Sequence, residues 1–173
     1  MIDTDRLLLR PWRAETLHIL RGFNEDAVLM THFSPERSAG DMNARFARMR
    51  HWEETLGFTF WAVIRRDDGE IIGSCGLKPL TIAWDRPDDI EIGWLIRQDC
   101  WGQGYAREAA SAVLAHGLTI APRVIAMTAQ SNAPSRGLMQ RLGMHQLADR
   151  DFDYPGYPDD HFARRHLVCA KEA

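Results

Sequence analysis

Residues 90–96 read Ile-Glu-Ile-Gly-Trp-Leu-Ile, and residues 101–109 read Trp-Gly-Gln-Gly-Tyr-Ala-Arg-Glu-Ala. In the first segment, large apolar residues at the even positions alternate with Glu91, Gly93 and Leu95, which is the two-residue period of a β-strand. After the second segment the apolar period lengthens to that of an amphipathic helix. The residues that share the apolar face of this helix are Ala109, Ala110, Val113, Leu114, Gly117 and Leu118.

Two glycines, Gly102 and Gly104, stand where the predicted strand passes into the predicted helix. Backbone N–H groups at a helix start, reinforced by the helix dipole, form a site for a phosphate or diphosphate. A tight connection without any ligand is the other interpretation of the same residues. The dinucleotide-binding pattern Gly-x-Gly-x-x-Gly is incomplete because Arg107 stands at its third glycine, and no Gly-Lys-Ser/Thr of a P-loop follows. The segment therefore predicts a phosphate-binding loop of another kind.

The same segment resembles the cofactor-binding core of the GNAT acetyltransferase superfamily, in which a Gln/Arg-x-x-Gly-x-Gly/Ala loop binds the diphosphate of acetyl-CoA. Trp101 stands at the Gln/Arg position, and Trp-Gly-x-Gly-Tyr-Ala-x-Glu-Ala is similar to the branch that includes the ribosomal-protein N-terminal (alanine) acetyltransferases. Residues 132–144 are similar to the family's Asn-x-x-Ser…Leu-Gly-Phe helix, and residues 4–12 to the first strand of that branch. The resemblance extends over nearly the whole chain in the family's order.

This resemblance implies an α/β (α+β) fold with a mixed, mostly antiparallel central sheet, one splayed strand pair and helices on both faces. It implies acetyl-CoA as acyl donor, with its pantetheine amides paired to free backbone groups of Trp94, Leu95 and Ile96. A backbone N–H of that strand would also donate to the developing oxyanion. The loop residues assigned to the cofactor in this way are Gly102, Gln103, Gly104, Tyr105, Ala106 and Arg107.

Periodicity and turn residues along the rest of the chain predict alternating helices and strands in one domain, residues 1–173. Asp67-Asp68-Gly69 predicts the turn of a hairpin, and Gly143 the end of a helix. The expected strands are 6–12, 58–65, 70–78, 90–96, 124–129, 144–150 and 162–169. The expected helices are 14–24, 38–55, 105–120 and 134–142, with a loop over 79–89.

Glu91 is the candidate general base. It projects from its strand on the face opposite Ile90 and Ile92, a few residues before the loop, and the family commonly has an acid at this place. Two other interpretations stay open: a charged residue on a solvated strand face, or a buried partner of an arginine. An α-amino group has a pKa of about 7.7–8.0, against about 10.4 for lysine, so a weak or water-mediated base suffices for a chain N-terminus.

Many GNAT enzymes have a tyrosine as the proton donor where this chain has Met139. Ser135 is the nearest motif residue with a proton, so we predict that it contacts the cofactor and either donates to its sulfur or relays a proton from water. A serine at a helix start also commonly satisfies backbone groups. Asn132 is placed to cap the same helix ahead of Pro134, whereas the resemblance directs it to the cofactor, which is the role we predict.

Two aromatic-rich stretches are candidates for the acceptor pocket: residues 31–33 with His51 and Trp52, and residues 151–161. Acids in the second stretch would attract a cationic amine or a basic peptide. The same density of Pro, Gly and Asp is also typical of an ordinary surface loop.

Bulk properties exclude several classes of protein. The net charge of −3 gives no overall attraction to nucleic acid or to an anionic membrane. No apolar run approaches the ~20 residues of a membrane span, and the N-terminus lacks the features of a signal peptide. Three cysteines cannot all pair within one chain, so we expect reduced thiols in the cytoplasm, with Cys100 structural or incidental. The seven histidines lack ligand spacing, so no metal site is expected.

Two classes of function follow. The first is an acetyl-CoA-dependent N-acetyltransferase that acts by direct transfer, without a covalent acyl-enzyme, on a peptide N-terminus, a polyamine or a small amine such as an aminoglycoside. The second is a non-catalytic acyl-CoA-binding module that senses the cofactor or assembles with a partner, which would accord with the missing tyrosine. We predict the first. Homodimerisation is an expectation from the family alone.

Overall fold

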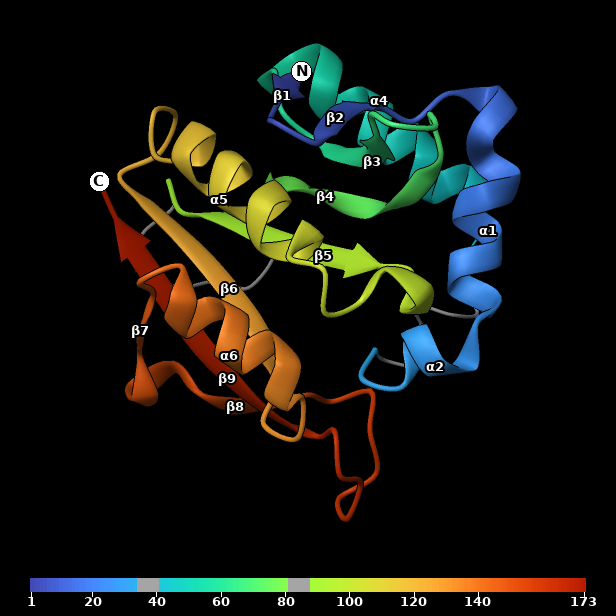
Figure 1. Ribbon diagram of the computed structural model, residues 1–173. Coiled ribbons are helices and arrows are strands. Elements are labelled where there is room, and N and C mark those ends of the chain that lie inside the picture. Colours follow the sequence, from blue (N-terminus) through green and yellow to red (C-terminus); the bar gives the residue numbers. More distant parts are fainter. Residues whose placement is uncertain (34–40, 81–87) are drawn as a thin grey trace.

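A single mixed sheet runs through the protein (Figure 1). The structure, a computed structural model, describes residues 1–33, 41–80 and 88–173. Its strands are β1 (Ile2–Asp3), β2 (Leu7–Pro11), β3 (Phe60–Arg65), β4 (Ile71–Pro79), β5 (Ile90–Ile96), β6 (Arg123–Ala129), β7 (His145–Gln146), β8 (Phe152–Asp153) and β9 (Arg165–Glu172). They are paired in the order β1-β2-β3-β4-β5-β6-β9-β7, and β8 also pairs with β9. Among the strands of the described residues only β5 and β6 are parallel, so the predicted mostly antiparallel sheet is confirmed.

Helices cover both faces of this sheet. The described helices are α1 (Leu17–Glu25), α2 (Ala27–Met30), α4 (Met42–Leu56), α5 (Tyr105–Gly117) and α6 (Ala133–Arg141), with 3₁₀ turns η1 (Ala14–Thr16), η2 (Gln98–Cys100) and η3 (Ala148–Arg150). Residues of α5 and α6 pack into one core cluster, and residues of α1, α2 and α4 pack into another, on the opposite face. Local signals set the helix ends: the Asp41 side chain accepts from Asn43 N–H, and Gly57 ends α4 with a left-handed φ of 76°.

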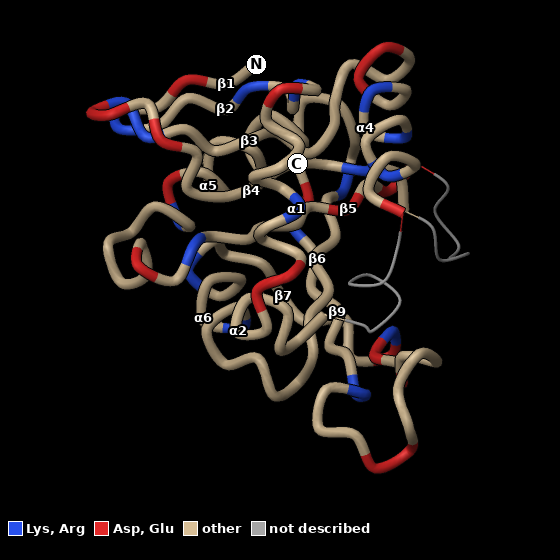
Figure 2. Tube along the Cα trace, turned by 90° about the vertical axis from the view of Figure 1, so that its right-hand side faces the viewer, with Lys and Arg blue, Asp and Glu red and all other residues tan. Residues whose placement is uncertain are grey.

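Charged residues of both signs are mixed over the surface (Figure 2). In this view the loop between β8 and β9 ends in an acidic tip, which contains Asp159 and Asp160. The Asp159 side chain is 95% exposed, so most of its charge is hydrated. The acidic tip borders a pocket that is part of the candidate site.

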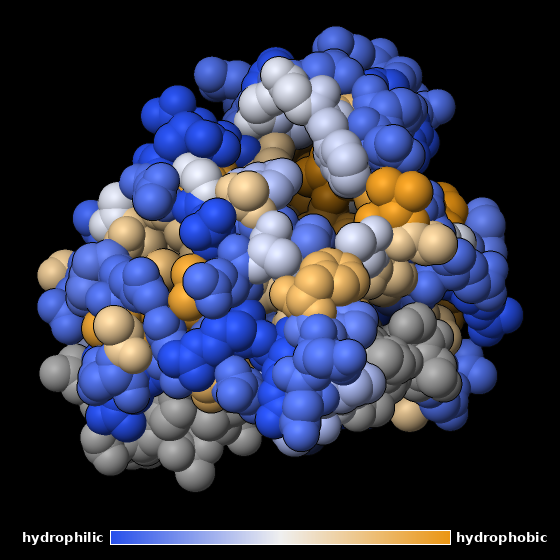
Figure 3. All heavy atoms as spheres, turned by 90° about the horizontal axis from the view of Figure 1, so that it is seen from below, coloured by the Kyte–Doolittle hydropathy of each residue, from blue (hydrophilic) through white to orange (hydrophobic). Residues whose placement is uncertain are grey.

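The sheet opens between β5 and β6. Parallel pairing joins only Ile90 to Val124 and Glu91 to Ile125. Beyond these pairs, β5 continues along β4 and β6 continues along β9, so the two halves of the sheet diverge. At this end of the molecule hydrophobic residues gather around a hollow, with hydrophilic residues about them (Figure 3). The predicted splayed strand pair is therefore present.

A buried ion pair fixes the point from which these strands diverge. Asp89 directly precedes β5 and Arg123 begins β6. The Arg123 guanidinium donates to the Asp89 carboxylate through Nε, 3.1 Å from each oxygen, and through a further contact from Nη2. The Asp89 side chain is 0% exposed and that of Arg123 is 13% exposed. The pair holds the two strands together at one end and leaves the other end free to diverge.

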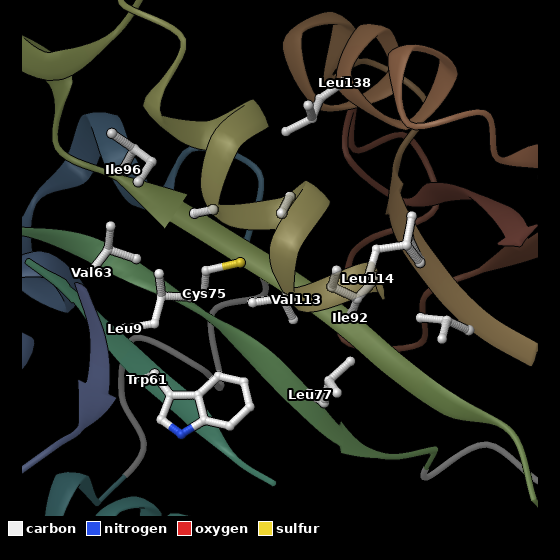
Figure 4. Close-up of a cluster of buried hydrophobic side chains, with 14 of the residues drawn as sticks. Leu9, Trp61, Val63, Cys75, Leu77, Ile92, Ile96, Val113, Leu114 and Leu138 are labelled. Carbon is white, nitrogen blue, oxygen red and sulfur yellow. The ribbon is translucent and has the colours of Figure 1, made fainter. Parts of the chain in front are cut away.

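The larger core cluster lies between α5 and the sheet (Figure 4). Val113 and Leu114 of α5 pack there with Leu77 and Ile92, and the predicted apolar face of this helix is buried from Ala109 to Gly117. A Cβ added at Gly117 would lie 3.0 Å from the Val124 side chain, so the helix approaches β6 closely. The labelled members of the cluster are Leu9, Trp61, Val63, Cys75, Leu77, Ile92, Ile96, Val113, Leu114 and Leu138.

The last two expected strands are wrong in extent. In place of a strand over 144–150, the short β7 is followed by the 3₁₀ turn η3. The Asp151 side chain accepts from the Val168 N–H at 2.9 Å, so a side chain takes the place of a neighbouring strand there. The final strand begins at Arg165 rather than 162, because the N–H of Arg164 bonds to the carbonyl of His161 in a turn.

Other boundaries differ by a few residues. The helix expected over 14–24 begins as the turn η1, and α5 ends at Gly117 rather than 120. The expected helix 38–55 corresponds to α4, and residues 38–40 lie outside the described residues. Most of the expected loop over 79–89, residues 81–87, also lies outside them, and Pro79 belongs to β4. The elements β1, α2 and β8 were not predicted.

Replacing Asp89 by Ala is expected to lower the free energy of unfolding by about 3–5 kcal/mol, because it leaves the largely buried Arg123 charge without its partner. Urea denaturation measures this loss. The control is Asp89→Leu with Arg123→Met, which removes both charges and is expected to lose much less. Equal losses in the two variants would mean that the ion pair is not what the strand junction depends on.

Candidate functional site

The backbone of β5 directs N–H and C=O groups into the opening between β5 and β6. Arg97 N–H donates to the Ile72 carbonyl at 2.8 Å. Because antiparallel pairs alternate, Leu95 directs its N–H and C=O to β4, whereas Trp94 and Ile96 direct theirs to the opening. The Ile96 carbonyl accepts from the Trp101 indole N–H at 2.6 Å. Of the three residues predicted to offer backbone groups, Trp94 and Ile96 therefore face the opening, and Leu95 is turned to β4.

The glycine loop leads from η2 into the N-terminus of α5. Gly102 and Gly104 have φ values of 74° and 84°, a left-handed conformation that glycine adopts without steric cost. Gly104 is the N-cap of α5 and no side chain caps the helix. The first bond along the helix runs from Glu108 N–H to the Gly104 carbonyl, so the preceding N–H groups of the first turn have no partner within the helix. This is a candidate anion site.

Sequence reasoning gave no role to the residues that hold this helix start. The Glu108 carboxylate accepts from the Thr4 hydroxyl at 2.6 Å, from the Arg6 backbone N–H at 2.8 Å and from Arg6 Nε at 2.7 Å. Burial alone would raise the pKa of Glu108, but these hydrogen bonds lower it below its ordinary value. The sequence does show a carboxylate in the first turn of this helix. It does not show the partners of that carboxylate, because they lie about a hundred residues away.

Glu91 is held by a lysine of the neighbouring strand. The Glu91 Oε2 lies 2.9 Å from the Nζ of Lys78, which stands directly opposite Glu91 on β4. The Glu91 side chain is 14% exposed. It lies on the predicted face, opposite Ile90 and Ile92. A solvated strand face is therefore the wrong description of its surroundings, and its ionic partner is a lysine rather than an arginine.

The start of α6 lies at the end of β6. The Asn132 side chain accepts from the Ser135 backbone N–H at 3.2 Å, so Asn132 caps this helix as its sequence position allowed. Ser135 is half-buried in the first turn. Met139, at the family's tyrosine position, is 2% exposed and belongs to the core, so it leaves no proton donor there.

His32, from the first candidate acceptor stretch, lies beside Phe162, the residue that directly follows the second stretch. Its Nδ1 lies 3.4 Å from the Ser131 hydroxyl, and its ring centroid is 5.8 Å from that of Phe162. Burial lowers the pKa of His32 below its ordinary value. Trp52 instead packs against the core cluster under α4, and His51 is exposed on that helix. The structure thus brings His32, but not His51 or Trp52, to the loop before β9.

A pocket of about 370 Å³ lies beside this junction. Two of its acids are already paired: Asp159 contacts Arg164, and Asp153 contacts Arg165 at 3.4 Å. It is lined by Gln130, Ser131, Asp153, Asp159, Asp160, His161, Phe162, Arg164 and Arg165.

The cysteines are free thiols without an activating environment. Cys100 is 2% exposed, and burial, followed by the nearby Asp99 carboxylate, raises its pKa above the ordinary value. Burial also raises the pKa of Cys75. A protonated thiol is a poor nucleophile, so neither residue resembles a catalytic cysteine.

Residues 1–33, 41–80 and 88–173 contain no group of three or more His, Cys, Asp or Glu placed to hold a metal ion. None of their helices has the length and apolarity needed to cross a membrane.

Comparison with known sequences gives a match over most of the chain. A sequence model of the family described as "Acetyltransferase (GNAT) domain" matches residues 6–145. The uncharacterized protein YkkB of Bacillus subtilis (strain 168) is 30% identical over 146 residues, which cover 82% of this chain and 83% of that protein.

Solved structures share the fold. The ribosomal-protein-alanine N-acetyltransferase of Brucella melitensis superimposes with a TM-score of 0.76 at 15% identity, covering 96% of this chain and 99% of that one. The yncA protein of Salmonella typhimurium, solved with its cofactor acetyl-CoA, gives a TM-score of 0.76 at 15% identity, covering 97% and 94%. At these identities the likeness concerns the fold alone.

Replacing Gly104 by Ala is expected to weaken CoA binding about tenfold, because a side chain there strains the left-handed backbone that directs the first N–H groups of α5. Calorimetric titration with CoA measures the effect. Gly69→Ala is the matched control, since Gly69 has a φ of 74° in the β3–β4 turn, away from the loop. Both variants should lose about 1 kcal/mol of stability. If the Gly104→Ala and Gly69→Ala variants bind CoA with equal affinity, the loop is not part of the binding site.

Proposed function

Because the chain belongs to the GNAT acetyltransferase family, we propose that it transfers an acetyl group directly from acetyl-CoA to a primary amine. Enzymes of this family use acetyl-CoA as acyl donor. The observation that carries the proposal is the junction of two features in one place. The backbone of Trp94 faces the opening beside β5. The uncapped start of α5, at Gly104, lies eight residues after the end of β5.

The residues present fit a diphosphate and an extended amide chain. In our proposal the N–H groups of residues 102–107 bind the diphosphate, as at other helix starts that bind phosphate. Trp94 and Ile96 pair with the pantetheine amides in the manner of an added strand. A Cβ at Gly102 would meet no atom of the described residues within 4 Å, so these residues leave open space beside the loop. Asn132 and Ser135, at the start of α6, are the proposed contacts from the opposite side of the opening.

Glu91 is the proposed base. The carboxylate accepts the proton of the amine, directly or through water, as the amine attacks the thioester carbonyl. The Trp94 N–H is the proposed donor to the oxyanion, because its direction across the opening is set by the β4–β5 register. Ser135 is the proposed donor to the leaving sulfur. A thiolate with a pKa of about 8.5 also leaves without a dedicated acid.

The acceptor belongs, in this proposal, in the region of His32 and the pocket before β9. A protein N-terminal α-amine fits the site best, because its pKa of about 7.7–8.0 demands little of a base that already forms an ion pair with Lys78. The name of one protein with this fold, a ribosomal-protein-alanine N-acetyltransferase, gives an example of such an acceptor. A small-molecule amine is the alternative acceptor, and it would take part in the same acetyl transfer. The free thiols accord with a reducing, cytoplasmic location.

A non-catalytic acyl-CoA-binding module is the second candidate, and the core position of Met139 favours it. The decisive measurement is acetyl-CoA-dependent thiol release, screened over N-terminal peptides, polyamines, aminoglycosides and amino acids. Release that requires one acceptor class establishes the enzyme. Saturable CoA binding without release in any class would favour the module.

Glu91→Gln is expected to lower kcat about 100-fold or more with the acceptor found, while CoA affinity stays within about threefold, because it removes a base and not a cofactor contact. Lys78→Met is the matched control, since it breaks the same ion pair and keeps the carboxylate. If both variants lose kcat equally, the pair is structural and Glu91 is not the base.

Cys100→Ser is expected to retain kcat within about threefold, because direct transfer needs no thiol and the pKa of the buried Cys100 is raised. Steady-state thiol release measures it. Loss of turnover with CoA affinity intact would instead indicate an acyl-enzyme at this cysteine.

A further inference from the structure

An acidic residue stands next to the proposed diphosphate site. Glu108 lies in the first turn of α5, directly after the N–H groups that have no helical partner. The helix dipole stabilises a carboxylate at this end of a helix. The same position brings its negative charge close to any anionic ligand of the loop, and like charges repel at short range. The chain must therefore offset this charge if the loop is to hold a diphosphate.

Both oxygens of Glu108 are bound on the side of the β1–β2 turn. Thr4 Oγ1 and the Arg6 N–H donate to Oε1, and Arg6 Nε donates to Oε2 at 2.7 Å. Arg6 Nη2 also lies 2.7 Å from Oε2. With these partners the carboxylate is held against the β1–β2 turn, and it does not cap the N–H groups of its own helix.

The Arg6 guanidinium also contacts the loop itself. Its Nη1 donates to the Gln103 carbonyl at 3.1 Å. Its Nη2 lies 3.4 Å from the place where a Cβ of Gly104 would stand, and its Cζ lies 4.6 Å above the centre of the Tyr105 ring. One cation therefore joins the acid, the loop carbonyl and the first residue of α5.

We infer that Arg6 is a positioning residue for the diphosphate of the acyl-CoA: it neutralises Glu108 and holds the Gln103 carbonyl away from the ligand, so that the loop N–H groups stay available. This inference rests on the proposed location of the cofactor on residues 102–107. Arg6 does not touch the reacting atoms, so its effect appears in the affinity for CoA and not in the chemical step.

A double-mutant cycle tests the inference, with the Kd for CoA measured by calorimetry at low and physiological salt. Arg6→Met is expected to raise this Kd about tenfold, more at low salt, because the Glu108 charge is no longer offset. Glu108→Gln added to Arg6→Met is expected to restore the Kd to within about threefold of the unmodified protein. Arg6→Lys keeps the positive charge and should lose little affinity for CoA. It also tests the inference if Arg6→Met fails to fold.

Two controls separate positioning of the diphosphate from general support of the loop. Arg10→Met removes a different ion pair of the same β1–β2 hairpin, that with Asp3, and should leave the Kd for CoA unchanged. Pantetheine, which lacks the diphosphate, should bind equally to the unmodified protein and to Arg6→Met.

Three results would overturn the inference. They are an unchanged Kd for CoA in Arg6→Met, a double variant that binds CoA as weakly as Arg6→Met, and an equal loss of affinity for pantetheine. Each leaves the proposed function standing, because the unmodified protein still binds CoA. Failure of the unmodified protein to bind CoA would instead overturn the proposed function and this inference together.

Discussion

The site depends on how little of β5 is paired with β6. A parallel ladder of two residue pairs, closed by the buried Asp89–Arg123 ion pair, joins the strands at one end only. Right-handed twist separates strands that are not held along their length. The backbone of β5 is left with N–H and C=O groups that a buried strand would normally satisfy within the sheet. A ligand with amide groups can pair with such an edge, so the interruption of the sheet is what creates the proposed binding surface.

The helix that follows β5 adds the candidate anion site to this edge. Its position comes from packing, since α5 lies on the larger core cluster with its apolar face buried. Its chemistry comes from glycine, because left-handed residues at 102 and 104 turn the chain without adding side chains over the N–H groups. The cluster of Thr4, Arg6 and Glu108 then ties this end of the helix to the first hairpin of the chain. Strand edge and helix start are thus held in one rigid frame.

The proposed catalytic groups fit an undemanding proton transfer. Glu91 is largely buried and already bound to Lys78, and Met139 removes the usual tyrosine from the opposite side. An acceptor that is substantially neutral near pH 7 needs little from either group, which is why we propose an α-amine rather than a lysine side chain as acceptor. His32, beside Ser131 and Phe162, lies in the region proposed for the entry of such an acceptor.

Local patterns in the sequence determined the strand 90–96, the helix after Gly104, the hairpin at Gly69 and the family resemblance, because periodicity, caps and turns are properties of neighbouring residues. The Asp89–Arg123 pair and the network around Glu108 could not be found in this way, since they join residues 34 and about a hundred positions apart. The same holds for Leu95, whose backbone direction follows from its register with β4. The strand predicted over 144–150 is shorter in the structure, because the Asp151 side chain takes the place of a strand partner. Sequence thus determined which elements form, and tertiary structure decided which polar groups are satisfied within the protein and which remain for a ligand.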